Sequence, residues 1–137
     1  MSTNRYQQGL DRLKHVDGKA GEDVIEQLAT VSPEFADLVV EFPFGDIYSR
    51  EGLDLRSREI ATLGAITVLG CAEPQLKVHI HAALNVGVTK DEIKEIIMQM
   101  AVYGGFPVAI NAMLAAKDVF DQYDMGSSNL SDIDESK

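Results

Sequence analysis

The sequence predicts an all-α protein. Apolar residues recur at intervals of three and four along almost the whole chain, as in "RYQQGLDRLKHV" at residues 5–16, and no segment shows the alternation typical of a strand. Helix start and stop signals separate these segments. Several of the expected helices are apolar on more than one face, so we also expect a homo-oligomer that buries those faces between subunits.

The first three helices are expected within the N-terminal third of the chain. Residues 6–16 and 21–31 each carry one apolar stripe. Ser32 is a capping residue, and Pro33 follows it at the first helical position, where the missing N–H costs nothing. Pro43 should kink or end this third helix, because it removes a backbone donor.

A polar loop at residues 49–53 leads to the fourth helix. Asp54 is expected to cap this helix, which runs to about Leu69 and is closed by Gly70. Pro74 opens the next helix, which is ended by Asn85 or by Gly87, the latter a residue type that favours the left-handed conformation.

Two further helices complete the expected domain. Thr89 and Glu92 have the spacing of a capping box, so a helix should begin at residue 90. The pair Gly104–Gly105 ends it, and Pro107 starts the last helix. We expect residues 1–125 to form a single helical domain and the polar segment 126–137 to be a disordered tail.

The composition narrows the classes of function. The chain has 137 residues, with 22 acidic against 12 basic residues and a net charge of −10, which disfavours binding to nucleic acid or to anionic lipid. A single cysteine cannot form an internal disulfide, and no apolar run approaches the roughly 18 residues of a membrane span. These features predict a cytoplasmic protein without nucleic-acid or membrane partners.

Glu59 is the first candidate functional residue. A helix advances about 100° per residue, which places Glu59 on the same stripe as Leu63 and Ile66. Burying a carboxylate on an apolar stripe costs on the order of several kcal/mol unless it is paired or protonated. Either Glu59 belongs to an enclosed site, or it reaches solvent near the helix start or pairs with Arg56 or Arg58.

His79 is the second candidate. It lies about 60° from Leu76, at the edge of the expected core stripe of its helix, whereas His81 lies on the other side, near Lys77, and should face solvent or a partner chain. A histidine in an enclosed site suits general acid–base chemistry. The alternative is a hydrogen-bonded structural histidine. Because the two imidazoles point to different faces and no other ligand motif is present, no metal site is predicted.

The segment "YGGFPVAIN" offers a possible anion site. Backbone N–H groups at Gly104 and Gly105, ahead of a helix start, are able to bind an anion, although a plain interhelical turn would have the same sequence. Tyr103 and Phe106 would then wall a pocket, or they fill the core. Asn111 is expected in a packed neighbourhood, where it would need a hydrogen-bond partner.

With these residues placed, the chain resembles the carboxymuconolactone decarboxylase family of the alkylhydroperoxidase D-like superfamily over roughly residues 35–120. The matching segments are "LDLRSREIATLGAI", "QLKVHIHAALNVGVTKDEI" and "MAVYGGFPVAINAM". The resemblance implies an all-helical subunit that assembles into rings, as a trimer or a hexamer. It also implies that Glu59 and His79 occupy the acidic and histidine active-site positions.

The implied reaction converts 4-carboxymuconolactone to 3-oxoadipate enol-lactone and CO2 without a cofactor. The substrate would be a small organic acid or lactone. His79 is expected to donate a proton to carbon, while Glu59 sets its protonation and orientation. The residues expected to bind substrate are Gly104, Gly105, Tyr103 and Arg58, with Arg50, Arg56 and Lys77 as further cations.

The position of Cys71 bears on the main alternative function, that of a thiol peroxidase. The thiol branch of the superfamily carries Cys-x-x-Cys four residues before the histidine, and counting back from His79 gives Gln75 and Ala72. Cys71 is one place out of register, so a disulfide-cycling peroxidase is not expected. Two alternatives stay open: a redox protein that uses Cys71 alone, and a non-catalytic oligomeric binding protein.

Overall fold

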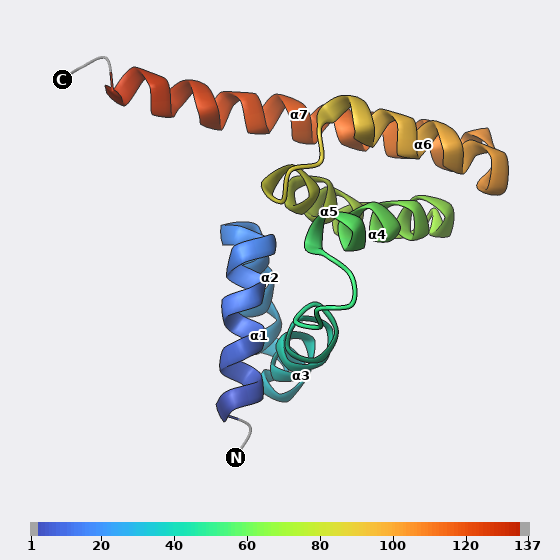
Figure 1. Ribbon diagram of the computed structural model, residues 1–137. Helices are drawn as coiled ribbons and strands as arrows, with labels where there is room; N and C mark the ends of the chain where they lie inside the picture. Colours follow the sequence, from blue (N-terminus) through green and yellow to red (C-terminus); the bar gives the residue numbers. More distant parts are fainter. Residues whose placement is uncertain (1–2, 135–137) are drawn as a thin grey trace. The chain divides into compact units, whose positions relative to one another are not determined.

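The computed structural model describes the backbone of residues 3–134 and the side chains of residues 4–126. Within this range the chain forms seven α-helices and one π-helix and has no strand, which confirms the all-α prediction (Figure 1). The elements are α1 (Thr3–Val16), α2 (Gly18–Val31), α3 (Pro33–Val39), η1 (Val40–Ile47), α4 (Leu55–Leu69), α5 (Glu73–Asn85), α6 (Lys90–Gly104) and α7 (Phe106–Asp134).

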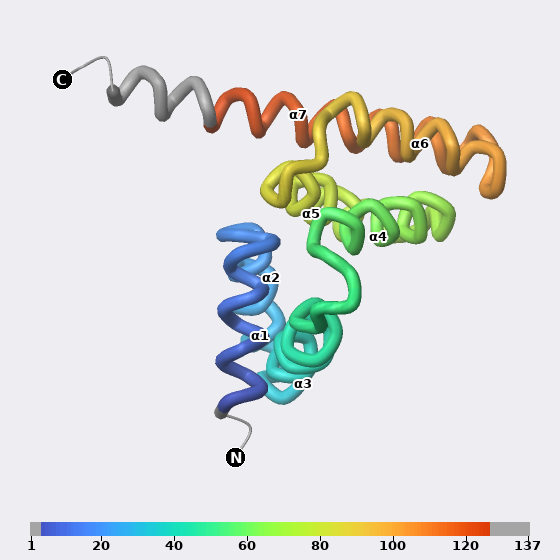
Figure 2. Tube along the Cα trace, in the orientation of Figure 1, coloured from blue at the N-terminus to red at the C-terminus, as the bar shows by residue number. Residues whose placement is uncertain are grey.

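The contacts divide the chain into two units. The first comprises residues 1–61 and 82–88, and the second comprises residues 62–81 and 89–137. The division passes through α4 and α5, each of which is one continuous helix (Figure 2). The start of α4 and the end of α5 therefore belong to the first unit.

The first unit has a core to which five elements contribute. Its buried members are Leu13 and Val16 of α1, Phe44 of η1 and Ala82 of α5. The partly buried residues packed against them are Ile25, Tyr48, Leu55 and Val86. This apolar cluster joins the C-terminal end of α1 to the first turn of α4 and the last turns of α5. Burial of such residues is the main force that holds these three ends together.

The helix that contains Pro43 behaves differently from the prediction. Ser32 caps its start as expected, since its hydroxyl accepts a hydrogen bond from the backbone N–H of Phe35 at 3.2 Å. At Pro43 the helix does not end. It has already widened at Val40 into the π-helix η1, in which the Tyr48 N–H donates to the Pro43 carbonyl at 2.7 Å. The wider turn of the π-helix accommodates Pro43, which has no backbone N–H to donate.

The second unit contains a pair of adjacent helices, α6 and α7, which run side by side (Figure 1). The capping box predicted at the start of α6 is present: Thr89 accepts from the Glu92 N–H, and Glu92 accepts from the Thr89 N–H. Gly105, with a φ of 91°, ends α6, as the sequence predicts.

The structure continues α7 to Asp134, beyond the domain end expected at residue 125. Residues 135–137 of the expected tail lie outside the described range. None of the helices in the described part of the chain combines the length and the apolar character needed to cross a membrane.

Candidate active site

Glu59 lies on α4, one turn after Leu55 in the core of the first unit. Asp54 caps this helix by accepting a hydrogen bond from the backbone N–H of Ser57 at 2.7 Å, and this bond lowers the pKa of the Asp54 carboxyl. The Glu59 side chain is fully buried, at 0% exposure. The alternative in which Glu59 reaches solvent is therefore wrong.

Arg58 is the cation predicted to bind substrate from the same helix. Its Nε donates to the Leu53 carbonyl at 3.1 Å and its Nη2 to the Arg50 carbonyl at 3.3 Å. Its guanidinium carbon also lies 6.0 Å from the centre of the Tyr48 ring, within reach of a cation–π interaction. The structure thus uses at least part of Arg58 to fix the loop that precedes α4.

His79 is positioned by the C-terminal part of α5. It lies one turn before Ala82 and Ala83, both of which are completely buried. Two turns further along, the Asn85 side-chain amide donates to the Val16 carbonyl at 3.1 Å, which attaches the end of α5 to the end of α1. His79 itself is half-buried.

Asp17 is a site residue that the sequence reasoning missed. It follows α1 directly, its N–H donates to the Leu13 carbonyl at 2.8 Å, and its side chain is 4% exposed. An aspartate ahead of a helix that begins with glycine is easily interpreted as a cap. In the described structure, however, Asp17 makes no side-chain capping hydrogen bond to α2.

The segment that follows leaves room for this orientation. Gly18 has a φ of 64°, in the left-handed region that favours glycine, and it turns the chain between α1 and α2. At Gly21 a Cβ atom would lie 2.4 Å from the Asp17 Cβ, so only glycine fits there without displacing Asp17. The sequence does not predict the role of either glycine, because each glycine also fits an ordinary helix boundary.

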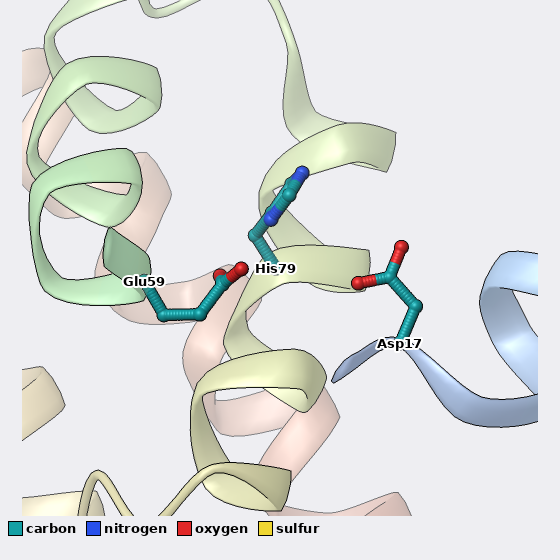
Figure 3. Close-up of side chains that lie close together, drawn as sticks. All are labelled: Asp17, Glu59 and His79. Atoms are coloured by element: carbon teal, nitrogen blue, oxygen red, sulfur yellow. The ribbon is translucent and has the colours of Figure 1, made fainter. Parts of the chain in front are cut away.

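These three side chains lie close together. One carboxylate oxygen of Asp17, one of Glu59 and a ring nitrogen of His79 all lie within 4.8 Å of one another. Glu59 extends from α4 and Asp17 from the junction of α1 and α2, and both reach toward the side of α5 that carries His79 (Figure 3). The structure therefore brings the two residues predicted as catalytic together and adds a second carboxyl group.

The charges in this cluster determine what it is able to do. Two buried carboxylates at such a separation repel each other unless a proton or another cation lies with them. A protonated His79 would supply that charge and would be a proton donor. Carboxylate and imidazole are also groups that bind divalent cations, and this is the one such three-residue group found among the described residues.

The predicted anion site at Gly104–Gly105 has a different geometry. The Gly105 N–H donates to the Ala101 carbonyl at 3.0 Å and so is already engaged in the end of α6. Tyr103 and Phe106 are both 74% exposed. The interhelical-turn alternative thus describes this segment, and neither aromatic side chain fills the core of its unit.

The remaining candidates lie in the second unit. Cys71 is exposed in the turn after α4. His81 is half-buried rather than solvent-facing, and its ring packs edge-on against Tyr123 with 5.5 Å between ring centres. Asn111 is exposed, and it lines a small cavity of about 50 Å³ with the buried Thr67.

Comparison with known proteins identifies the family of this chain. Residues 33–118 match the carboxymuconolactone decarboxylase family. A protein of Acinetobacter baylyi named 4-carboxymuconolactone decarboxylase is 37% identical over 117 residues, which cover 85% of this chain and 87% of that protein.

Two other relatives are similar. An uncharacterised 15.0 kDa protein of Paracoccus denitrificans, from the nqo9–nqo10 intergenic region, is 42% identical over 82% of this chain and 79% of its own. A protein of Metarhizium robertsii named nitrosuccinic acid decarboxylase is 38% identical over 66% of this chain and 63% of its own. The chain therefore belongs to the carboxymuconolactone decarboxylase family and has its alkylhydroperoxidase-like helical fold.

Proposed function

We propose that this protein is a cofactor-independent carboxy-lyase of the 4-carboxymuconolactone type. Family membership and two relatives named decarboxylases support decarboxylation as the type of reaction. The observation that carries the proposal is the buried cluster, in which an imidazole nitrogen lies within 4.8 Å of two carboxylate oxygens. Such a cluster can store and deliver one proton.

The substrate class supplies its own electron sink. In 4-carboxymuconolactone, the electron pair of the breaking C–C bond passes through the unsaturated ring into the lactone carbonyl as CO2 leaves. In nitrosuccinic acid, the compound in the name of the fungal relative, the carboxylate on the nitro-bearing carbon releases its electrons into the nitro group. Both acids decarboxylate to a stabilised anion that then takes up one proton on carbon.

His79 would supply that proton. As CO2 departs, the imidazolium of His79 would stabilise the developing oxyanion by its charge and then transfer a proton to carbon, becoming neutral. A proton from solvent would restore the imidazolium. Glu59, buried beside it, would orient the ring and favour its charged form.

The second carboxylate of such a substrate requires a cation. Lys77 is already engaged, with Glu73 at 3.6 Å and Asp118 at 3.2 Å. Arg56 and Arg58 lie on the same helix as Glu59, and both are half-buried. We assign the substrate's second carboxylate to these two arginines, because they lie on the helix that carries Glu59.

The test is direct assay of CO2 release from 4-carboxymuconolactone by the purified protein. We expect turnover by the wild type and a loss of about 10²- to 10⁴-fold in kcat for His79→Ala, the usual contribution of a proton donor. His15→Ala is the matched control, because His15 is exposed on α1. Full activity in His79→Ala would exclude the assigned role, and a wild type inactive on this lactone would exclude the substrate.

We also propose that a second copy of the chain covers the apolar face of α6 and α7. A groove of about 480 Å³ follows this face, lined by Ile97, Met98, Ala101, Val102, Phe106, Ala109, Ile110 and Met113. Val102 is 77% exposed, an unfavourable position for a valine in a monomer. In sedimentation velocity, we expect an oligomer for the wild type and a smaller species for Val102→Asp. Val31→Asp, a substitution of a valine on α2 that is 86% exposed, is the control and should leave the assembly intact.

A further inference from the structure

We infer that Asp17 is a positioning residue of this site, which together with Glu59 holds the His79 imidazole in its protonated form. The inference rests on the proposed role of His79 as proton donor. Asp17 places a carboxylate oxygen within 4.8 Å of both His79 and Glu59. Because it comes from the α1–α2 junction rather than from α4, it approaches the imidazole from a different element than Glu59 does (Figure 3).

The local structure directs Asp17 to this position at a cost to α2. At the start of a helix, an aspartate normally accepts a hydrogen bond from the first-turn N–H groups, which stabilises the helix by about 1 kcal/mol. Asp54 does so at the start of α4. Asp17 stands at the same position of α2 without that capping bond in the described structure, and its side chain is buried toward the cluster instead.

The backbone on which Asp17 lies is held by the core of the first unit. Val16, the residue before Asp17, is completely buried, and its carbonyl accepts the hydrogen bond from Asn85 of α5. Ala82, one turn after His79, belongs to the same apolar cluster as Val16. Asp17 thus follows a member of this core directly, and His79 precedes another member by one turn of the continuous helix α5, as a positioning role requires.

Other charged groups on α5 lie on the opposite side of the helix. Lys77 and His81 are each two residues from His79, which places them about 160° around the axis. Lys77 pairs with Glu73 and Asp118, and His81 packs against Tyr123. These groups are therefore poorly placed to set the charge of His79.

The elements that pack against the end of α5 carry further charged groups. On α1 and α2, Lys14 pairs with Glu22 at 3.8 Å. On α4, Arg56 and Arg58 lie about 60° and 100° around the helix from Glu59, and the charge of each opposes protonation of His79. The two carboxylates, each with an oxygen within 4.8 Å of a ring nitrogen, favour the imidazolium.

The test measures the titration of His79 by NMR in the ligand-free protein, so it requires no substrate. The three imidazoles are distinguished with His79→Gln. We expect His79 to titrate at least one pH unit above the ordinary histidine value of about 6.5. Asp17→Asn, which keeps the shape of the side chain but removes its charge, should lower the His79 midpoint by at least half a unit.

Asp54→Asn is the matched control, because it also neutralises an aspartate ahead of a helix and asparagine caps equally well. It should leave the His79 midpoint unchanged. The inference is overturned if Asp17→Asn moves that midpoint no further than Asp54→Asn does, or if His79 titrates below the ordinary histidine value of about 6.5. The inference is also overturned if the purified protein contains one equivalent of a divalent metal and the His79 midpoint changes when that metal is removed. None of these outcomes depends on whether the lactone is the substrate.

Discussion

Glu59→Gln is the substitution that examines the proposed proton chemistry most directly. Glutamine has nearly the same volume as glutamate, so the fully buried site stays filled while one negative charge disappears. If Glu59 stabilises the imidazolium of His79, the variant should hold the catalytic proton less tightly. The active form of the enzyme would then disappear at a lower pH than in the wild type.

The distance in the structure gives the size of this effect. The atoms of Glu59 and His79 lie within 4.8 Å of each other, and at that upper limit two unit charges attract by about 3.5 kcal/mol when the effective dielectric constant is about 20. One pH unit corresponds to about 1.36 kcal/mol, so complete burial would give a shift of roughly 2.5 units. His79 is only half-buried and solvent screens part of the attraction, which reduces the expectation to about one to two units.

The assay is the pH profile of kcat/KM for CO2 release from 4-carboxymuconolactone between about pH 5 and 9, a range that brackets the titration of histidine. The apparent pKa of the alkaline limb should fall by about one to two units in Glu59→Gln, and kcat should fall by about 10²-fold or more. Glu41→Gln is the matched control: Glu41 is also buried in the first unit, where it pairs with Arg5 at 3.0 Å. An alkaline limb that stays in place in Glu59→Gln, with normal turnover, would refute the reasoning.

Two further predictions concern stability. The hydrogen bond from Arg5 lowers the pKa of the Asp46 carboxyl below its ordinary 3.8, so its stabilising contribution is present above about pH 4 and is lost as the pH falls through the lower, folded-state value. Asp46→Asn should therefore reduce the free energy of unfolding at pH 7, measured in urea, and flatten its decline below pH 4. Gly21→Ala should destabilise the protein by about 1–3 kcal/mol in the same experiment, because its Cβ would displace Asp17, and should also reduce CO2 release.

Each of these has its own control. The control for Asp46→Asn is Asp23→Asn, which removes an exposed acid that pairs with Lys19 on the same helix. Below pH 4, the slope of the unfolding free energy against pH should change less in Asp23→Asn than in Asp46→Asn. An equal change in both variants would contradict the assignment to the Arg5 pair. For Gly21→Ala the comparison is Gly52→Ala, where an added methyl group would meet no described atom within 4 Å. If the two glycine variants are equally stable and active, the close approach to Asp17 has no consequence.

Much of the fold follows from local sequence. Ser32 with Pro33, Asp54, and the pair Thr89 and Glu92 all begin helices where the sequence predicts, because a capping side chain satisfies N–H groups only a few residues away. A periodic apolar stripe acts over the same short range. Helix existence and most helix boundaries are therefore local properties that one sequence contains.

Pro43 shows the limit of that reasoning. The missing donor of a proline predicts a break, but the chain instead widens into η1 and continues to Ile47. Phe44 of η1 is part of the core of the first unit. The packing of that turn against α1 is a tertiary contribution that a local rule does not include.

The candidate site likewise has features that the sequence predicts and features that only the tertiary structure shows. The sequence alone determined that Glu59 lies on an apolar stripe and that His79, not His81, lies at the edge of a core, because both follow from helical periodicity within one segment. Only the tertiary structure decided that Asp17 joins them and that the Gly105 N–H is already engaged. The physical reason is range: a capping aspartate and one in a buried cluster have the same neighbours in sequence, and the distinction arises when Val16, Ala82 and Leu55 pack into one core.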